Sequence, residues 1–141
     1  MKKILMTLSA VLCCAVVTTV FIACQKSEEE MQSQLVGTWT ERNDLYTDVL
    51  TLNEDGSFSF RSDAVPSMQS HANLYNGSGS YKFERIKSPN FHFGTNNRDQ
   101  YADFLHLIYS NKETQTLEIR KLSSSVLEMT DRYGYTFHFG K

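Results

Sequence analysis

The fold is decided by residues 48–61, which read DVLTLNEDGSFSFR. Apolar and polar residues alternate on both sides of Asp55-Gly56, and a period of two is typical of half-buried β-strands. The Asp-Gly pair predicts a tight hairpin, because glycine accepts positive φ without a Cβ clash. The two leucines of the first strand are then expected to share a face with the two phenylalanines of the second.

The same alternation recurs from residue 35 to the end of the chain. It predicts strands at residues 35–41, 48–52, 57–61, 79–85, 90–94, 104–109, 116–122, 126–131 and 135–139, with a single helical turn at 31–34. An antiparallel meander exposes its edge strands unless it closes on itself. We therefore expect an all-β protein, an antiparallel up-and-down β-barrel of eight or nine strands, with a two-sheet sandwich as the alternative.

Residues 62–78 interrupt the alternation with Pro66, Asn73, Asn76 and Gly77. Loops of this length are uncommon in compact domains unless they have a function. One interpretation is a disordered excursion. The other is a lid over one end of the barrel, with Met68, Leu74 and Tyr75 turned inward.

Two stretches resemble a known family. Residues 35–39, LVGTW, resemble the Gly-x-Trp signature of lipocalins, and LTLNEDGSF at 50–58 followed by GSY at 79–81 is similar to the small lipocalin-like domains of bacterial lipoproteins. The resemblance covers residues 35–141. It implies that Trp39 closes one end of the barrel and that an arginine near the last strand, here Arg132, stacks on it. A plain core aromatic is the alternative for Trp39.

The predicted interior is rich in aromatic side chains. An eight-stranded barrel is wide enough either to be filled by its own side chains or to hold one small ligand. The resemblance implies a small apolar ligand or a surface glycan, with tyrosines supplying polar groups, and the alternative is a ligandless accessory or interaction module with a solid core. The candidate lining residues are Phe58, Phe60, Tyr81, Phe83, Phe91, Phe93, Tyr135 and Phe137.

Residues 1–23 have the layout of a secretory signal, with Lys2 and Lys3, a long uncharged run and Ala23 before Cys24. The junction resembles the lipobox of bacterial lipoproteins, although Phe21 departs from the usual leucine. The resemblance implies that the Cys24 thiol carries a diacylglycerol and that fatty acyl chains such as palmitate anchor the protein to the lipid bilayer. A transmembrane anchor or an ordinary signal that releases a soluble protein are the alternatives.

Residues 24–34 are expected to form the lipidated cysteine and a solvated acidic linker, because QKSEEE at 25–30 has no apolar residue to bury. A short acidic run after the cysteine resembles the signal that sends some lipoproteins to the outer face of the outer membrane. We therefore expect a lipid-anchored protein of the bacterial outer membrane, facing either the cell surface or the periplasm.

Charge and cysteine content narrow the classes of partner and site. The formal net charge of the 141-residue chain is -2, and no basic stripe is present, which argues against a nucleic-acid partner. No cysteine follows Cys24, so the domain cannot contain a disulfide framework or a cysteine-based zinc site. The length suits one domain, which we expect to be monomeric.

The sequence predicts no catalytic residue, metal site or cofactor. Its four histidines lack metal-ligand spacing, and no serine lies in a Gly-x-Ser-x-Gly motif. An enzyme is the remaining alternative, and it would require His92, His106 or His138 to meet a carboxylate in a cleft.

Overall fold

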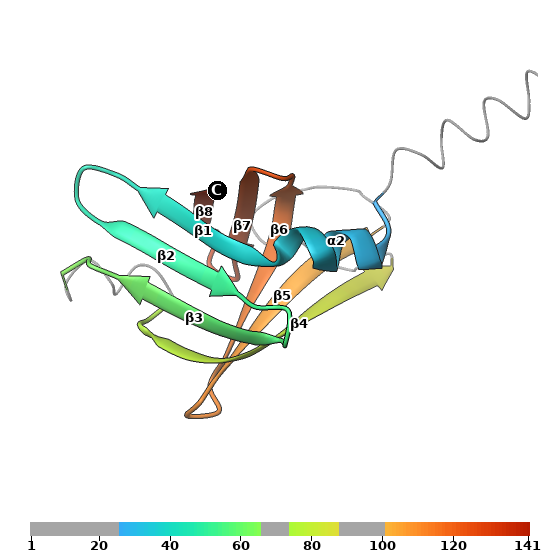
Figure 1. Ribbon diagram of the computed structural model, residues 1–141, viewed down its shortest axis with the longest axis horizontal. Helices are drawn as coiled ribbons and strands as arrows, with labels where there is room; N and C mark the ends of the chain where they lie inside the picture. Colours follow the sequence, from blue (N-terminus) through green and yellow to red (C-terminus); the bar gives the residue numbers. More distant parts are fainter. Residues whose placement is uncertain (1–25, 66–73, 88–100) are drawn as a thin grey trace, which may run out of the picture. The chain divides into compact units, whose positions relative to one another are not determined.

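The protein forms a closed antiparallel β-barrel (Figure 1). The computed structural model describes residues 26–65, 74–87 and 101–141. Each strand pairs with the next along the chain, and β8 pairs with β1. The strands are β1 (Gly37–Arg42), β2 (Thr47–Leu52), β3 (Ser57–Ser62), β4 (Gly77–Lys87), β5 (Tyr101–Tyr109), β6 (Thr114–Leu122), β7 (Val126–Asp131) and β8 (Thr136–Gly140). The predicted up-and-down barrel is confirmed with eight strands, and the predicted strand at 90–94 lies outside the described residues.

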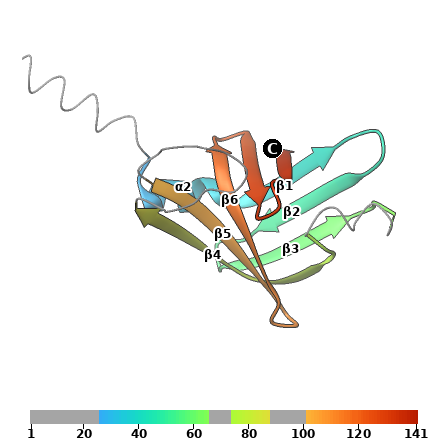
Figure 2. The ribbon, with the colours of Figure 1, turned by 180° about the vertical axis from the view of Figure 1, so that it is seen from behind.

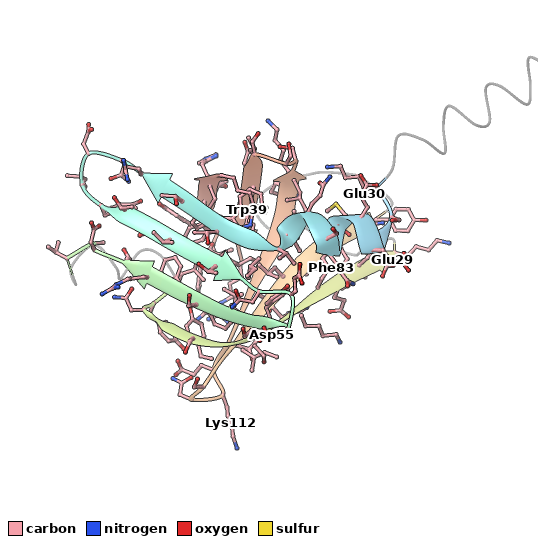
Figure 3. All side chains as sticks on the ribbon, in the orientation of Figure 1. Glu29, Glu30, Trp39, Asp55, Phe83 and Lys112 are labelled. Carbon is pink, nitrogen blue, oxygen red and sulfur yellow. The ribbon has the colours of Figure 1, made fainter. Side chains whose placement is uncertain are left out.

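The β2–β3 hairpin forms as its sequence predicts. Gly56 adopts a φ of 81°, and the Asp55 side chain, labelled in Figure 3, accepts a 2.8 Å hydrogen bond from the Ser57 amide. Leu50 pairs with Phe60 and Leu52 with Phe58, and all four side chains are buried. The turn therefore sets the register that directs these apolar side chains inward.

The remaining strands differ in length and in the extent of their pairing. Figure 2 shows the long strands β4, β5 and β6 side by side, as their registers require. Pairing between β6 and β7 is shifted by a bulge between Ile119 and Lys121. The barrel closes between β1 and β8 through a single paired position, Thr40 with Gly140.

The middle of the barrel is filled by its own side chains. A side chain without accessible surface touches neither solvent nor a cavity large enough for water, and a packed interior at crystal-like density is usual for folded domains. The side chains with 0% relative exposure are Leu35, Trp39, Leu50, Leu52, Leu105, Leu107, Leu117, Leu127, Met129 and Phe137.

A helix, α2 (Glu28–Leu35), replaces much of the predicted linker. The Ser27 hydroxyl accepts a 3.1 Å hydrogen bond from the Glu30 amide, which caps the first turn. Met31 and Leu35, four positions apart, are buried in the core. The helical turn predicted at 31–34 is therefore part of a longer helix, and the part of the predicted solvated linker from Met31 onward belongs instead to the compact barrel unit.

None of the helical segments in the described part of the chain has the length and hydrophobicity that a membrane span requires. The predicted signal peptide at 1–23 and Cys24 lie outside the described residues.

Trp39 contacts Leu35 and Lys141 near the start of β1 and the end of β8, and we call these three residues the plugged end. The Trp39 indole donates a 2.7 Å hydrogen bond to the Leu35 carbonyl. The Lys141 ammonium lies 4.2 Å from the centre of the Trp39 ring. It also donates to the carbonyls of Gln34 and Val36, at 3.2 and 2.7 Å.

The prediction that Arg132 stacks on Trp39 is wrong. Arg132 lies in the exposed turn between β7 and β8, where its guanidinium is 4.7 Å from the centre of the Tyr133 ring. That turn precedes β8, whereas Lys141 follows it, so Arg132 and Trp39 are at opposite ends of the barrel. Lys141 therefore supplies the cation that the lipocalin resemblance assigned to an arginine.

Candidate functional site

The end of the barrel opposite the plugged end is lined by polar side chains. It is formed where β1 turns into β2, β3 runs toward β4 and β7 turns into β8. We call this end the mouth, and we define it by five residues. They are Glu41, Tyr46, Asp48, Ser62 and Tyr135.

The two mouth carboxylates are direct neighbours across β1 and β2. Glu41 pairs with Asp48 in the register that also pairs Trp39 with Leu50, so both carboxylates continue the inward face of their strands. Asp48 is only 3% exposed. The Ser62 hydroxyl hydrogen-bonds this carboxylate, but its Oδ1 atom is buried without a hydrogen-bond partner.

Each of the two mouth tyrosines follows a turn that is fixed by side-chain hydrogen bonds to the backbone. The Tyr46 and Tyr135 hydroxyls lie 3.0 Å apart. The Asn43 side chain accepts hydrogen bonds from the amides of Leu45 and Tyr46, at 2.8 and 3.0 Å. Such Asx turns fix the backbone locally, here at Leu45 and Tyr46.

A second Asx turn positions Tyr135. The Asp131 carboxylate accepts 2.9 Å hydrogen bonds from the amides of Tyr133 and Tyr135, and Gly134 supplies the positive φ, 87°, that the turn requires. The Tyr135 ring then packs edge-on against Phe137, with ring centres 4.9 Å apart. This contact joins the mouth to the apolar core.

Burial and like charge dominate the electrostatics of the mouth. Burial raises the pKa of Asp48, with a further increase from the Asp63 charge, and the Ser62 hydrogen bond opposes both. Burial likewise raises the pKa of Glu41, and the charge of Asp48 adds to it, while a 3.2 Å hydrogen bond from the His138 amide acts in the opposite sense. The charged form of each carboxylate is therefore destabilised in the folded protein.

The pKa of the Tyr135 phenol is raised as well. Burial raises its pKa well above the usual range for tyrosine, and the Tyr46 hydroxyl and the charges of Glu41 and Asp48 raise it further. The Tyr135 hydroxyl therefore stays protonated at physiological pH. Together with the Tyr46 hydroxyl, it offers both donors and acceptors beside two hydrogen-bond-accepting carboxylates.

The loop before β4 packs against the core at this end. Leu74 is 1% exposed and belongs to the core cluster, and Tyr75 stacks on Tyr109 with ring centres 4.2 Å apart. The Asn76 side chain bonds the amide and the carbonyl of Ser62, at 2.6 and 3.1 Å. Leu74 is therefore buried and Tyr75 is partly buried against the core, and Met68, the third residue of the lid interpretation, lies outside the described residues.

The predicted lining residues do not gather at one site. Phe58, Phe60, Phe83 and Phe137 are buried in the core, and the Tyr81 hydroxyl donates to the Asn53 carbonyl at the β2–β3 turn. Among the predicted lining residues that are described, Tyr135 alone belongs to the mouth. Phe91 and Phe93 lie outside the described residues.

The sequence patterns did not predict Glu41, Tyr46, Asp48 and Ser62 as site residues. The signal was present, because Glu41 and Asp48 occupy inward positions of the period-two pattern that begins at Trp39 and ends at Leu52. A charged residue at an inward position of a strand is a candidate for a functional site.

One histidine meets a carboxylate, on the outer face of the barrel. His106 Nε2 lies 2.8 Å from a carboxylate oxygen of Glu84, and Nδ1 lies 2.9 Å from the Thr116 hydroxyl. His138 is also outward, with Nδ1 3.8 Å from Glu128, and His92 lies outside the described residues. Within the described ranges, no group of three or more histidine, cysteine, aspartate or glutamate residues could hold a metal ion.

Comparison of the chain with protein-family models, with curated proteins and with solved structures gave no match. The candidate site therefore depends on the geometry of the mouth alone.

Proposed function

We propose that this protein is a lipoprotein of the bacterial outer membrane, anchored through acylated Cys24, whose lipocalin-like barrel binds a small polar ligand such as a glycan at the mouth. The observation that carries the binding proposal is the Asp48 carboxylate, which is 3% exposed and has an oxygen without a hydrogen-bond partner. Leaving a buried polar atom unpaired costs about 1–3 kcal/mol. A ligand that displaces the side chains covering this buried atom and donates a hydrogen bond to it would recover that cost.

The filled core favours the mouth over the barrel interior as the binding site. The leucines and Phe137 in the middle of the barrel have no accessible surface, which leaves no space for an apolar ligand among them. Carboxylates accept hydrogen bonds from sugar hydroxyls, and tyrosines add an apolar ring and a polar tip. Of the two ligand classes implied by the resemblance, a glycan therefore suits the mouth better than an apolar molecule.

Acylation of Cys24 is tested by metabolic labelling with a fatty-acid analogue. We expect label in the wild-type chain and none in Cys24→Ala. Cys13→Ala is the matched control, because Cys13 lies within the predicted signal, and it should retain the label. Label that persists in Cys24→Ala would contradict lipid anchoring at this residue.

Ligand binding is tested by native mass spectrometry of the full chain in detergent with a panel of neutral and charged mono- and disaccharides. We expect a one-to-one adduct with at least one member, lost in Asp48→Asn and retained in Asp55→Asn. Asp55 is a suitable control because its carboxylate lies at the β2–β3 turn, away from the mouth. A panel without any adduct would support the ligandless interaction module instead.

A further inference from the structure

The mouth carries negative charge that its own residues do not neutralise. Glu41 and Asp48 face each other across two strands, and the charge of Asp63 also acts on Asp48. In the described part of the chain, no lysine or arginine forms an ion pair with either mouth carboxylate. The basic group that acts on Glu41 is His138, whose side chain is 63% exposed and lies beside Glu128 on the outer face.

The unpaired oxygen of Asp48 shows that the mouth lacks a hydrogen-bond donor at this position. A neutral hydroxyl could donate one hydrogen bond to it, but the repulsion between the two carboxylates would remain. A protonated amine supplies several N–H donors and a positive charge together, and hydrogen bonds between charged partners are about twice as strong as neutral ones. The hydroxyls of Tyr46 and Tyr135 have lone pairs that can accept further N–H groups.

We propose that the mouth recognises a protonated primary amine, and that its ligands are small amine-bearing molecules such as amino sugars. This inference rests on the proposed function and narrows the class of ligand. The amine nitrogen is placed beside the carboxylates of Glu41 and Asp48, and binding moves the side chains that cover Asp48 Oδ1 so that this atom can accept a hydrogen bond.

A metal ion suits the mouth less well than an amine. Hard cations such as Ca²⁺ take six to eight oxygen ligands, including several carboxylates. The mouth offers two facing carboxylates, and within the described residues no group of three or more potential metal ligands is present. An ammonium group needs only a few acceptors, which this arrangement provides.

The inference is tested by isothermal titration of the full chain in detergent with glucosamine, N-acetylglucosamine and glucose at neutral pH. The three sugars share a ring, and glucosamine alone carries the charged amine. We expect glucosamine to bind at least about tenfold more tightly than either neutral sugar, the scale of one additional charge-assisted hydrogen bond. Asp48→Asn should abolish this preference, and Glu84→Gln, on the outer face, should leave it unchanged.

A second readout separates charge recognition from shape. Glu41 and Asp48 have raised pKa values and face Asp63, Ser62, Tyr46, Tyr135 and, from outside, His138. At a pH where these carboxylates are partly protonated, a bound cation favours their charged forms, so glucosamine binding should release protons, seen as a heat that varies with the buffer. Glucose should release none.

The outcomes distinguish this inference from the proposed function. Equal affinity for glucosamine and glucose would overturn recognition of the amine and leave glycan binding at the mouth in place. Failure of all three sugars to bind would also overturn it, and the saccharide panel described above would then decide separately whether the mouth binds any ligand.

Discussion

The Lys141 ammonium lies 4.2 Å from the centre of the Trp39 ring and donates hydrogen bonds to two carbonyls at the end of α2. One side chain thus joins the end of β8, the beginning of β1 and the helix. A cation over an aromatic face is stabilising, and so is a cation at the carbonyl end of a helix. Gly37 makes room for this arrangement, since a Cβ there would lie 2.7 Å from the Lys141 side chain.

Lys141→Ala should lower the free energy of unfolding by about 1 kcal/mol, because it removes the cation–π contact and the bonds to the helix carbonyls. The measurement is urea unfolding of the full chain in detergent. Lys82→Ala, at an exposed position of β4, is the control and should change stability by less than about 0.5 kcal/mol. Equal effects of the two substitutions would show that the Lys141 contact contributes nothing.

Leu35→Ala should lower the free energy of unfolding by about 2–5 kcal/mol, because it removes a fully buried side chain at the plugged end. This tests whether α2 belongs to the folded barrel unit, as its burial indicates. Ser33→Ala, at an exposed position of the same helix, should have little effect. If Leu35→Ala lowered the free energy of unfolding as little as Ser33→Ala, the result would favour the predicted flexible linker over a packed helix.

The fold could be predicted because its information is local and repeated. The alternation of apolar and polar residues and the Asp55-Gly56 turn determine the strands and their register. A meander of these strands avoids exposed edges if it closes into a barrel. The helix was predicted only as a single turn at 31–34, because the acidic run before it resembles a solvated tether. Its stability comes from the Ser27 cap and from burial of Met31 and Leu35, which depends on the tertiary fold.

Asp48→Asn should raise the free energy of unfolding at pH 7, since it removes a buried charge whose pKa is raised in the folded state, chiefly by burial. A raised pKa means that the folded protein holds the proton more tightly than the unfolded chain. The stabilisation is therefore present below the unfolded value, near 3.8, and is lost as pH rises through the folded value.

The gain in Asp48→Asn should accordingly shrink as pH falls toward 4, and urea unfolding at pH 7 and pH 4 measures it. Asp55→Asn is the control, because the pKa of Asp55 is lowered by its bonds to Ser57 and should give the opposite pH trend. A variant that is more stable and yet loses ligand would identify Asp48 as a residue retained for binding. Loss of stability at pH 7 in Asp48→Asn would contradict this interpretation.

Tyr46→Phe and Tyr135→Phe should each destabilise the protein, and together by less than the sum, because both remove the same 3.0 Å hydrogen bond. A double-mutant cycle should give a coupling of about 1 kcal/mol. Tyr133→Phe provides a comparison, since Tyr133 is 67% exposed and its hydroxyl bonds only its neighbour Arg132. Zero coupling between Tyr46 and Tyr135 would mean that the mouth is not preorganised by this pair.

The candidate site was only partly predictable, because it depends on which strand ends meet. Tyr135 was predicted as a polar group of the binding site. Tyr46 lies 89 positions away along the chain, and the two hydroxyls meet only after the barrel closes. Arg132 was assigned to the wrong end because sequence distance to the last strand does not say which side of that strand a residue lies on.

The most direct test of ligand binding at the mouth is amide chemical-shift mapping of the full chain in detergent during titration with glucosamine. We expect saturable shifts at Tyr46, Asp48, Ser62 and Tyr135, with the β2–β3 turn at Asp55 and the plugged end at Lys141 unchanged. Shifts that concentrate at the plugged end, or no saturable shift at the mouth, would contradict the proposed site.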